Sequence, residues 1–389
     1  MAKRFPRILR KRLVEPFFAF IDDSRSVGIV LLVNTVLSLW LANSIWGTDY
    51  LAVINYTFHL PEWLHLPHSV LHWINDGLMA IFFFMVGLEI KQETTQGELR
   101  SMKRAMLPIV GAVGGMILPA AIFIAFNQGT EYANGWGIPM ATDIAFSLGI
   151  ASLLGSRFPL GLKVFLTALA IIDDLGAIIT IAVFYSAEIK FWFLLAAAGI
   201  SLGLYGLGRM KYYGVLSYML GIALWYCFFQ SGIHATLAGV IFALFIPARE
   251  QERVLHVLHK PVNFVIIPIF ALANTAIVLP ASILAALGNT LNWGIIAGLV
   301  VGKPLGIVGA AWISIKMKWA SLPSGIGWMH LWGAGILAGI GFTMSIFIAT
   351  LAFSDPAFTD ISKIAVMLGS LLSMVLGLLW MGGMIREKR

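Results

Sequence analysis

The sequence predicts an all-α polytopic membrane protein with twelve transmembrane helices. Two features of composition indicate the membrane: 59% of the 389 residues are hydrophobic, and only 12% are charged. The mean hydropathy is +0.88. A soluble domain carries about 25% charged residues, and its interior cannot hide this much apolar surface because surface area grows almost in proportion to mass. Soluble enzymes, nucleic-acid-binding proteins and disordered scaffolds are therefore excluded.

Apolar stretches of the length that a bilayer requires, about 17 to 25 residues, recur along the whole chain. The twelve predicted spans are 27–44, 70–92, 104–126, 137–155, 160–186, 191–208, 213–230, 232–248, 262–280, 293–315, 328–353 and 361–384. We expect one transmembrane domain over 27–384, a basic cytoplasmic arm at 1–26 and a short cytoplasmic tail at 385–389. The single cysteine, Cys227, excludes an intramolecular disulfide.

The basic residues agree with this count of spans. If the N-terminus is cytoplasmic, Lys190 and Lys363 lie on the outer side of the membrane and Lys303 lies within a span. The other 23 of the 26 Lys and Arg residues then lie on the cytoplasmic side. An excess of basic residues in cytoplasmic loops is typical of membrane proteins. We therefore expect a protein of the inner (cytoplasmic) membrane with both termini in the cytoplasm.

Two adjacent carboxylates in the fifth span are the strongest indication of function. Asp173 and Asp174, in LTALAIIDDLGAIITIAVF, lie in the middle of a long uncharged stretch. Ionisable groups inside a bilayer are costly and usually functional. Desolvation and mutual repulsion favour the binding of a proton by such a pair, and ionised carboxylates are hard oxygen ligands for a small cation. The structural alternative is a carboxylate satisfied by a helix end or an ion pair.

The fourth span combines a carboxylate with residues that break helices. Asp143 follows Gly137, Pro139 and Thr142 in GIPMATDIAFSLG. A helix interrupted at membrane depth exposes N–H groups and a positive end that a carboxylate offsets. Thr142 offers a hydroxyl and a carbonyl to a cation. In the alternative interpretation, Asp143 simply caps the start of a helix.

The eleventh span shows the same signs of interruption. Gly339 and Gly341 precede Thr343 and Ser345 in GAGILAGIGFTMSIFIA. A helix-packing face of small residues is the structural alternative. The fourth and eleventh spans are an odd number of spans apart, so they run in opposite directions. Two interrupted helices in inverted orientation are typical of transporters built from inverted repeats, here spans 3–5 and 10–12.

Lys303, in the tenth span, requires an anionic partner within the membrane. We predict that it pairs with a buried aspartate or offsets the negative ends of interrupted helices. Asp76 lies near the outer end of the second span and is either a boundary residue or an ion-binding group.

Four further residues are candidates for an ion entrance or a pH response. Glu89 and Glu93 lie at the inner end of the second span. They form either a cytoplasmic entrance that attracts cations or an ordinary solvated surface. His234 follows a tight turn, and His256 lies in an expected cytoplasmic loop. Free histidine titrates near pH 6.5, although both histidines are also compatible with purely structural roles.

No metal cluster, phosphate-binding loop or Ser/His/Asp arrangement is apparent, so we expect no enzyme activity, no nucleotide and no cofactor. Paired aspartates suggest one enzymatic alternative, an intramembrane aspartyl protease. That chemistry requires two aspartates on separate helices, whereas Asp173 and Asp174 are adjacent, and Phe342 stands after Gly-Ile-Gly where such a protease would carry its acid.

Six stretches together resemble the NhaA family of bacterial sodium/proton antiporters. They are WINDGLMAIFFFMVGLEIK (73–91), IPMATDIAFSLGIASLLGSR (138–157), ALAIIDDLGAI (168–178), SGIHATLAGV (231–240), GKPLGI (302–307) and GIGFTMSIFIA (339–349). The resemblance implies twelve spans, with the fourth and eleventh helices unwound and crossing at mid-membrane. It also implies a homodimer.

The resemblance assigns roles to residues that match the family's motifs. It implies that Asp173 and Asp174 bind sodium and exchange it for protons, with Thr142 nearby. Asp143 and Lys303 match residues that offset the helix ends, and Lys303 is expected to pair with Asp173 when sodium is absent.

In the same way, Glu89, Glu93, His234 and His256 match positions of the entrance or the pH response. Two departures concern this regulatory part: Leu255 and Gln92 stand where the family carries an acidic and a basic residue.

We predict an antiporter that exports sodium and lithium in exchange for protons, electrogenically, by alternating access at the aspartate pair. Its partners are then sodium, protons, the lipid bilayer and a second copy of the chain. A sodium-coupled symporter of the same architecture is the second hypothesis, and it requires uptake of an organic solute. A passive cation channel is the third, for which rings of acidic residues from several subunits are typical.

Overall fold

The structure is a computed structural model that describes residues 23, 25–59, 61, 65–155, 158–186, 188–280 and 288–386. Most of the expected N-terminal arm and C-terminal tail lies outside the described residues. The described part is all-helical, as predicted; it contains no sheet, and Thr57 and Ser69 form an isolated antiparallel bridge.

The α-helices follow the predicted apolar stretches. Their bounds are α3 Ser26–Ala42, α4 Gly47–Ile54, α5 Val70–His72, α6 Met79–Thr95, α7 Met102–Asn127, α8 Ile144–Leu153, α9 Leu160–Phe184, α10 Phe191–Arg209, α11 Val215–Ser231, α12 Leu237–Phe245, α13 Ala248–Pro261, α14 Ile267–Asn274, α16 Thr290–Ala297, α17 Lys303–Lys316, α18 Trp328–Ala338, α19 Phe342–Ala352 and α20 Pro356–Arg386. π-Helical turns at η3 (Trp73–Leu78), η7 (Val262–Ile266) and η8 (Gly298–Gly302) lie inside longer helices, and 3₁₀ turns form η4 (Glu98–Arg100) and η5 (Ala133–Met140).

Fewer than twelve helices are long and apolar enough to cross a membrane without interruption. Within the described residues there are 7 of them, or up to 10 when each of three bent helix pairs is taken as one span. The two expected spans that remain, 213–230 and 232–248, correspond to α11 with 17 residues and α12 with 9 residues. Both segments are apolar, but the turn at 232–236 shortens the helical part.

The segment expected to form the cytoplasmic loop with His256 is instead helical. Helix α13 continues through η7 into α14 as one element, Ala248–Asn274. The prediction was wrong because the charged residues of 248–261 occupy one side of an amphipathic helix. Gln251 and Val254 are buried on the other side, whereas the His256 side chain is exposed.

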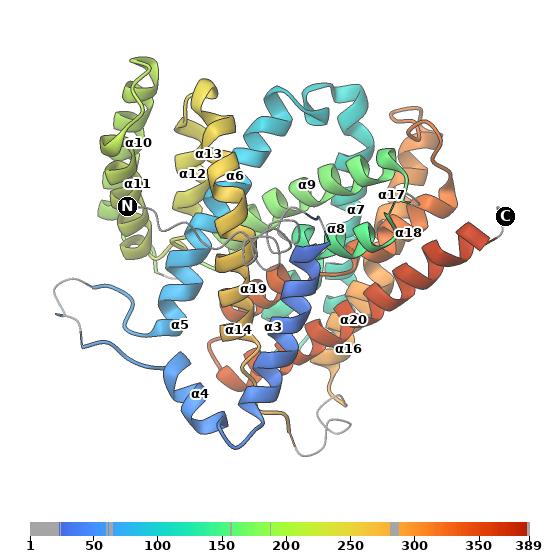
Figure 1. Cartoon of the computed structure of the whole chain (residues 1–389), viewed down its shortest axis with the longest axis horizontal. Coiled ribbons are helices and arrows are strands. Elements are labelled where there is room, and N and C mark those ends of the chain that lie inside the picture. The colour runs from blue at the N-terminus through green and yellow to red at the C-terminus, as the bar shows by residue number, and fades with distance from the viewer. Residues whose placement is uncertain are drawn as a thin grey trace, which may run out of the picture.

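Two groups of buried apolar side chains hold the bundle together. The larger one includes most helices, and the smaller one is built from α6, α10, α11 and α12. Figure 1 shows α10 and α11 side by side at one edge of the molecule, with α9, α14 and α19 nearer its centre and α20 toward the other edge. Helix α6 contributes to both groups and joins them.

Helix α12 approaches α6 closely through Gly239. A Cβ atom at Gly239 would clash with the Ala80 carbonyl and would lie 2.8 Å from the Phe84 backbone nitrogen. We expect Gly239→Val to destabilise the protein by about 1–3 kcal/mol, because overpacking forces backbone shifts. Thermal unfolding in detergent measures this loss. Gly309→Val, where no atom lies within 4 Å of the added Cβ, is the matched control; equal unfolding temperatures for the two variants would contradict the prediction.

Candidate functional site

Two interrupted helices meet near the centre of the bundle. Elements η5 and α8 form one bent pair, at 40°, and α18 and α19 form another, at 46°. The Asp143 backbone N–H donates to the Ile340 carbonyl at 2.8 Å, so the two breaks are hydrogen-bonded to each other. The glycines and proline that predicted the interruptions flank these breaks.

One carboxylate serves the starts of both half-helices. Asp143 Oδ1 accepts from the Phe146 N–H of α8 at 2.9 Å, and Oδ2 accepts from the Thr343 N–H of α19 at 3.0 Å and from the Thr343 hydroxyl. The Phe342 N–H of α19 donates to Ser370 Oγ of α20 at 3.1 Å. A negative group at a helix N-terminus satisfies free N–H groups and opposes the helix dipole. Asp143 therefore caps the start of its own helix, α8, as expected, and also the start of a second helix, α19.

The sequence left open whether the buried Lys303 amine pairs with an aspartate or offsets a negative helix end. In the structure it does both. Its Nζ lies 2.6 Å from Asp173 Oδ2 and also donates to the carbonyl of Met140, the last residue of η5. The side chains of Lys303 and Asp173 have no exposed surface. Lys303 thus pairs with an aspartate and occupies the negative end of an interrupted helix at the same time.

Thr142 links the same aspartate to the second break. Its hydroxyl oxygen lies 2.6 Å from Asp173 Oδ2 and 2.9 Å from the carbonyl oxygen of Ala338, the last residue of α18. A hydroxyl carries a single hydrogen, so it donates to one of these oxygens at a time. Thr142 therefore lies between the carboxylate and a free helix end.

The aspartate pair lies on α9, which is uninterrupted, and its two members differ in their contacts. Lys303 and Thr142 both contact Oδ2 of Asp173. Asp173 Oδ1 and Asp174 Oδ1 are buried and have no hydrogen-bond partner within the described part of the chain. Asp174 is only 1% exposed. Buried polar atoms are nearly always satisfied, so these oxygens are suited to a proton or a small cation.

The electrostatic surroundings favour such a ligand. Asp173, Asp143 and Glu89 repel the negative charge of Asp174, and Lys303 attracts it. Because the acidic groups outnumber the basic one, addition of a proton or a monovalent cation relieves repulsion. Among the described residues, no group of three or more His, Cys, Asp and Glu side chains converges as a resident metal would require.

Apart from the effect of the Glu89 charge on Asp174, the interactions of the other predicted residues are with groups outside the aspartate pair. Glu89 and Glu93 are one turn apart on α6, and Glu93 Oε2 accepts from the Glu98 N–H at 2.9 Å. His234 is half-buried, with Nε2 2.8 Å from the Tyr185 carbonyl oxygen. Asp76 lies in η3 and contacts His72. His256, on the exposed side of α13, is not brought to the site.

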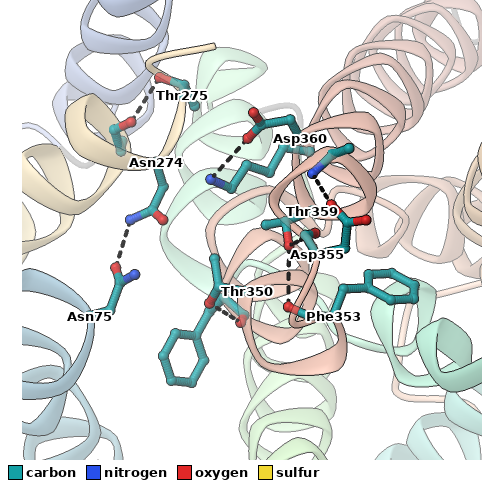
Figure 2. Close-up of polar contacts among 12 residues, drawn as sticks. Asn75, Asn274, Thr275, Thr350, Phe353, Asp355, Thr359 and Asp360 are labelled. Atoms are coloured by element: carbon teal, nitrogen blue, oxygen red, sulfur yellow. Dashed lines mark hydrogen bonds and ion pairs between the residues drawn. The ribbon is translucent and has the colours of Figure 1, made fainter. Parts of the chain in front are cut away.

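Sequence reasoning passed over several neutral polar residues. Besides Ser370, these include Asn75 and the fully buried Asn274, whose Nδ2 donates to Asn75 Oδ1 at 2.8 Å (Figure 2). Figure 2 also shows Asp360 of α20, which lies 3.7 Å from the Lys363 amine. Asparagine and serine within an apolar stretch carry the signal that could have identified them, because a buried amide or hydroxyl also requires a partner.

The chain is similar to known proteins over nearly its whole length. The family model described as Na+/H+ antiporter 1 matches residues 18–381. The chain is 48% identical to the Na(+)/H(+) antiporter NhaA 1 of Flavobacterium johnsoniae over 377 residues, 95% of this chain and 97% of the relative. It is 47% identical to the Na(+)/H(+) antiporter NhaA of Cytophaga hutchinsonii over 383 residues, 97% of each chain. It is 44% identical to the Na(+)/H(+) antiporter NhaA 1 of Clostridium beijerinckii over 381 residues, 95% of each chain.

Proposed function

Because this chain belongs to the Na+/H+ antiporter 1 family and is a secondary transporter of the NhaA type rather than an enzyme, we propose that it expels Na+, and Li+ as well, while protons enter the cell. The observation that carries this proposal is the buried pair Asp173–Asp174, in which one oxygen of each carboxylate has no hydrogen-bond partner within the described residues. Oxygen ligands from this pair and Thr142 suit a small hard cation.

Transport follows from competition for the pair. In the absence of sodium, the Lys303 ammonium neutralises Asp173 across 2.6 Å. Sodium at Asp174 and Asp173 displaces this ion pair, and protons displace sodium in turn. Only a loaded site changes the side of the membrane that it faces, so export of sodium requires return of protons.

The exchange is electrogenic. Two carboxylates take up two protons while one sodium ion leaves, so one net positive charge enters in each cycle. The membrane potential then contributes about 2.3 kcal/mol per charge per 100 mV. This contribution drives sodium export without a nucleotide.

The architecture that supports this cycle has twelve spans, with α11 and α12 counted as the seventh and eighth. Spans 3–5 and 10–12 are inverted repeats, and the bent pairs η5–α8 and α18–α19 cross at mid-membrane. The hydrogen bond between the two breaks supports this arrangement, because a pair of interrupted helices is typical of inverted-repeat transporters. Asp143 and Lys303 offset the charges of the four helix ends that meet there.

Access and regulation involve the remaining candidates. Both termini lie in the cytoplasm, the protein is located in the inner membrane, and Glu89 and Glu93 line the inner entrance. His234, His256 and Asp76 contribute to the pH response. The protein functions as a homodimer.

A pH-gradient assay tests the proposal. In proteoliposomes with an acidic lumen, addition of sodium or lithium chloride should dissipate the gradient, and choline chloride should not. Valinomycin with potassium on both sides should accelerate the exchange, because it removes the opposing potential that electrogenic exchange builds up. An exchange rate that valinomycin leaves unchanged would contradict electrogenicity. No response to sodium from mildly acid to mildly alkaline pH would contradict antiport.

A further inference from the structure

A π-helical turn interrupts the second span at the end opposite to Glu89 and Glu93. This turn, η3, carries Asn75 and Asp76 between α5 and α6. The Trp225 indole N–H of α11 donates to the Asp76 backbone carbonyl at 3.0 Å. Single π turns within α-helices are rare and occur frequently at functional sites. The function proposed above gives Asp76 of this turn a contribution to the pH response and no step in proton transfer.

Asp76 forms an ion pair with a histidine that is not part of the aspartate site. His72 Nε2 lies 2.8 Å from Asp76 Oδ2, and the side chains are 48% and 13% exposed, respectively. The carboxylate is thus nearly enclosed, whereas the imidazole reaches the surface. Histidine is the side chain whose charge changes most readily between pH 5 and 8, so the exposed member of the pair can collect protons from water.

Aromatic side chains hold this imidazole in place. The His72 ring lies 5.7 Å from the Phe229 ring, which stacks on Trp225 at 5.6 Å, and Trp225 stacks on Trp73 at 5.7 Å. These contacts tie His72 to α11 on one side and to η3 on the other. A histidine that served only as a solvated surface residue would not require such a support.

Asp76 also faces the interior of the bundle through His234. The charge of Asp76 acts on His234, and His234 Nε2 lies 2.8 Å from the carbonyl of Tyr185, which follows the last residue of α9. Helix α9 carries Asp173 and Asp174. His234 therefore interacts with the charge of Asp76 and contacts the end of the helix that holds the aspartate pair.

Other titratable groups surround this end of the bundle. His65 lies in the loop before α5, and its carbonyl accepts from Gln230 of α11 at 2.7 Å. His68 is exposed in the same loop, and Tyr226 stands next to Trp225 on α11. Lys190 precedes α10 and donates through its backbone N–H to the Ser231 carbonyl at 2.8 Å. The group that the ion-pair geometry places against the Asp76 carboxylate is the His72 imidazole, at 2.8 Å.

We propose that His72 and Asp76 form a proton-transfer pair through which protons enter from the outer side. The proposal rests on the proton/sodium exchange proposed above. The imidazolium of His72 gives its proton to the Asp76 carboxylate, and the neutral imidazole takes another proton from water. Asp76 then passes its proton inward, so that both groups return to their starting charge and one proton has moved.

The experiment separates the two faces of the membrane. Right-side-out vesicles are loaded with radioactive sodium at a fixed alkaline lumen pH, and sodium efflux is measured while the medium pH varies. We expect His72→Gln to slow efflux roughly tenfold in neutral and alkaline medium. This is less than the factor of about 10²–10⁴ typical of acid–base groups, because Asp76 still takes protons directly from water. In acidic medium the variant should match the wild type.

Everted vesicles supply the second readout, because there the medium contacts the inner end of the protein. The dependence of transport on medium pH should be the same for His72→Gln and the wild type in that orientation. Asp76→Asn should slow efflux in right-side-out vesicles more than His72→Gln does, because no carboxylate then takes up the proton. The double variant should add nothing to the effect of Asp76→Asn, because both groups act in one relay. His68→Gln, which changes an exposed histidine of the preceding loop, is the matched control and should behave as the wild type.

The outcomes distinguish this inference from the function on which it rests. Absence of sodium efflux in the wild type would overturn the antiport proposal. Wild-type efflux with an unchanged outer pH dependence in His72→Gln would overturn only the relay. A loss that is equal at every pH and in both vesicle orientations would also overturn it, because it would show a structural role for His72.

Discussion

Asp174→Asn should abolish sodium-dependent dissipation of a pH gradient while leaving the protein folded. The amide has nearly the same shape as the carboxylate, but it carries no charge and exchanges no proton. Asp173 cannot replace it, because Lys303 and Thr142 already contact one of its oxygens. Loss of one charged ligand costs about 1.5–3 kcal/mol, which is a decrease in sodium affinity of roughly 10- to 150-fold.

Two measurements check this expectation. Initial rates of gradient dissipation in proteoliposomes report transport, and binding of radioactive sodium to purified protein reports affinity. Asp174→Glu retains the charge and should keep part of the binding. Asp49→Asn, which removes an exposed carboxylate in the first turn of α4, is the matched control. Wild-type transport by Asp174→Asn would place the ion site elsewhere.

Lys303→Met should destabilise the folded protein by about 3–5 kcal/mol, the usual cost of removing one partner of a buried ion pair. The substitution leaves Asp173 as an unpaired buried charge and removes the donor to the Met140 carbonyl. The thermal unfolding temperature in detergent measures this loss. Lys303→Arg retains the charge and should lose less, although a guanidinium has a different shape from the amine.

A double variant separates the ion pair from other effects of the substitution. In Asp173→Asn/Lys303→Met, both charges are absent, so stability should recover toward that of the wild type, because replacing both partners of a buried pair is often neutral. The double-mutant cycle should therefore show a large coupling energy. Additive losses from the two single substitutions would contradict a direct stabilising contact between Lys303 and Asp173.

Much of the candidate site could be predicted from the sequence, because charged residues stand out within apolar stretches. Asp173, Asp174, Asp143 and Lys303 are all buried, as their positions within the predicted spans required. The neutral partners were not accessible in this way. Ser370 and Asn274 carry no charge, and their importance depends on which N–H or amide they meet.

The sequence by itself determined the all-α membrane class, the positions of most helices and the interruptions of two of them. These properties depend on local composition, because hydropathy and helix breakers act over one span. Only the tertiary structure decided that one Asp143 carboxylate serves two half-helices and that Lys303 meets both Asp173 and the end of η5. Asp143 and Thr343 are 200 residues apart, and Asp173 and Lys303 are 130 apart. Such contacts depend on how the helices pack, and packing is decided by side-chain shape across the whole bundle rather than by any single segment.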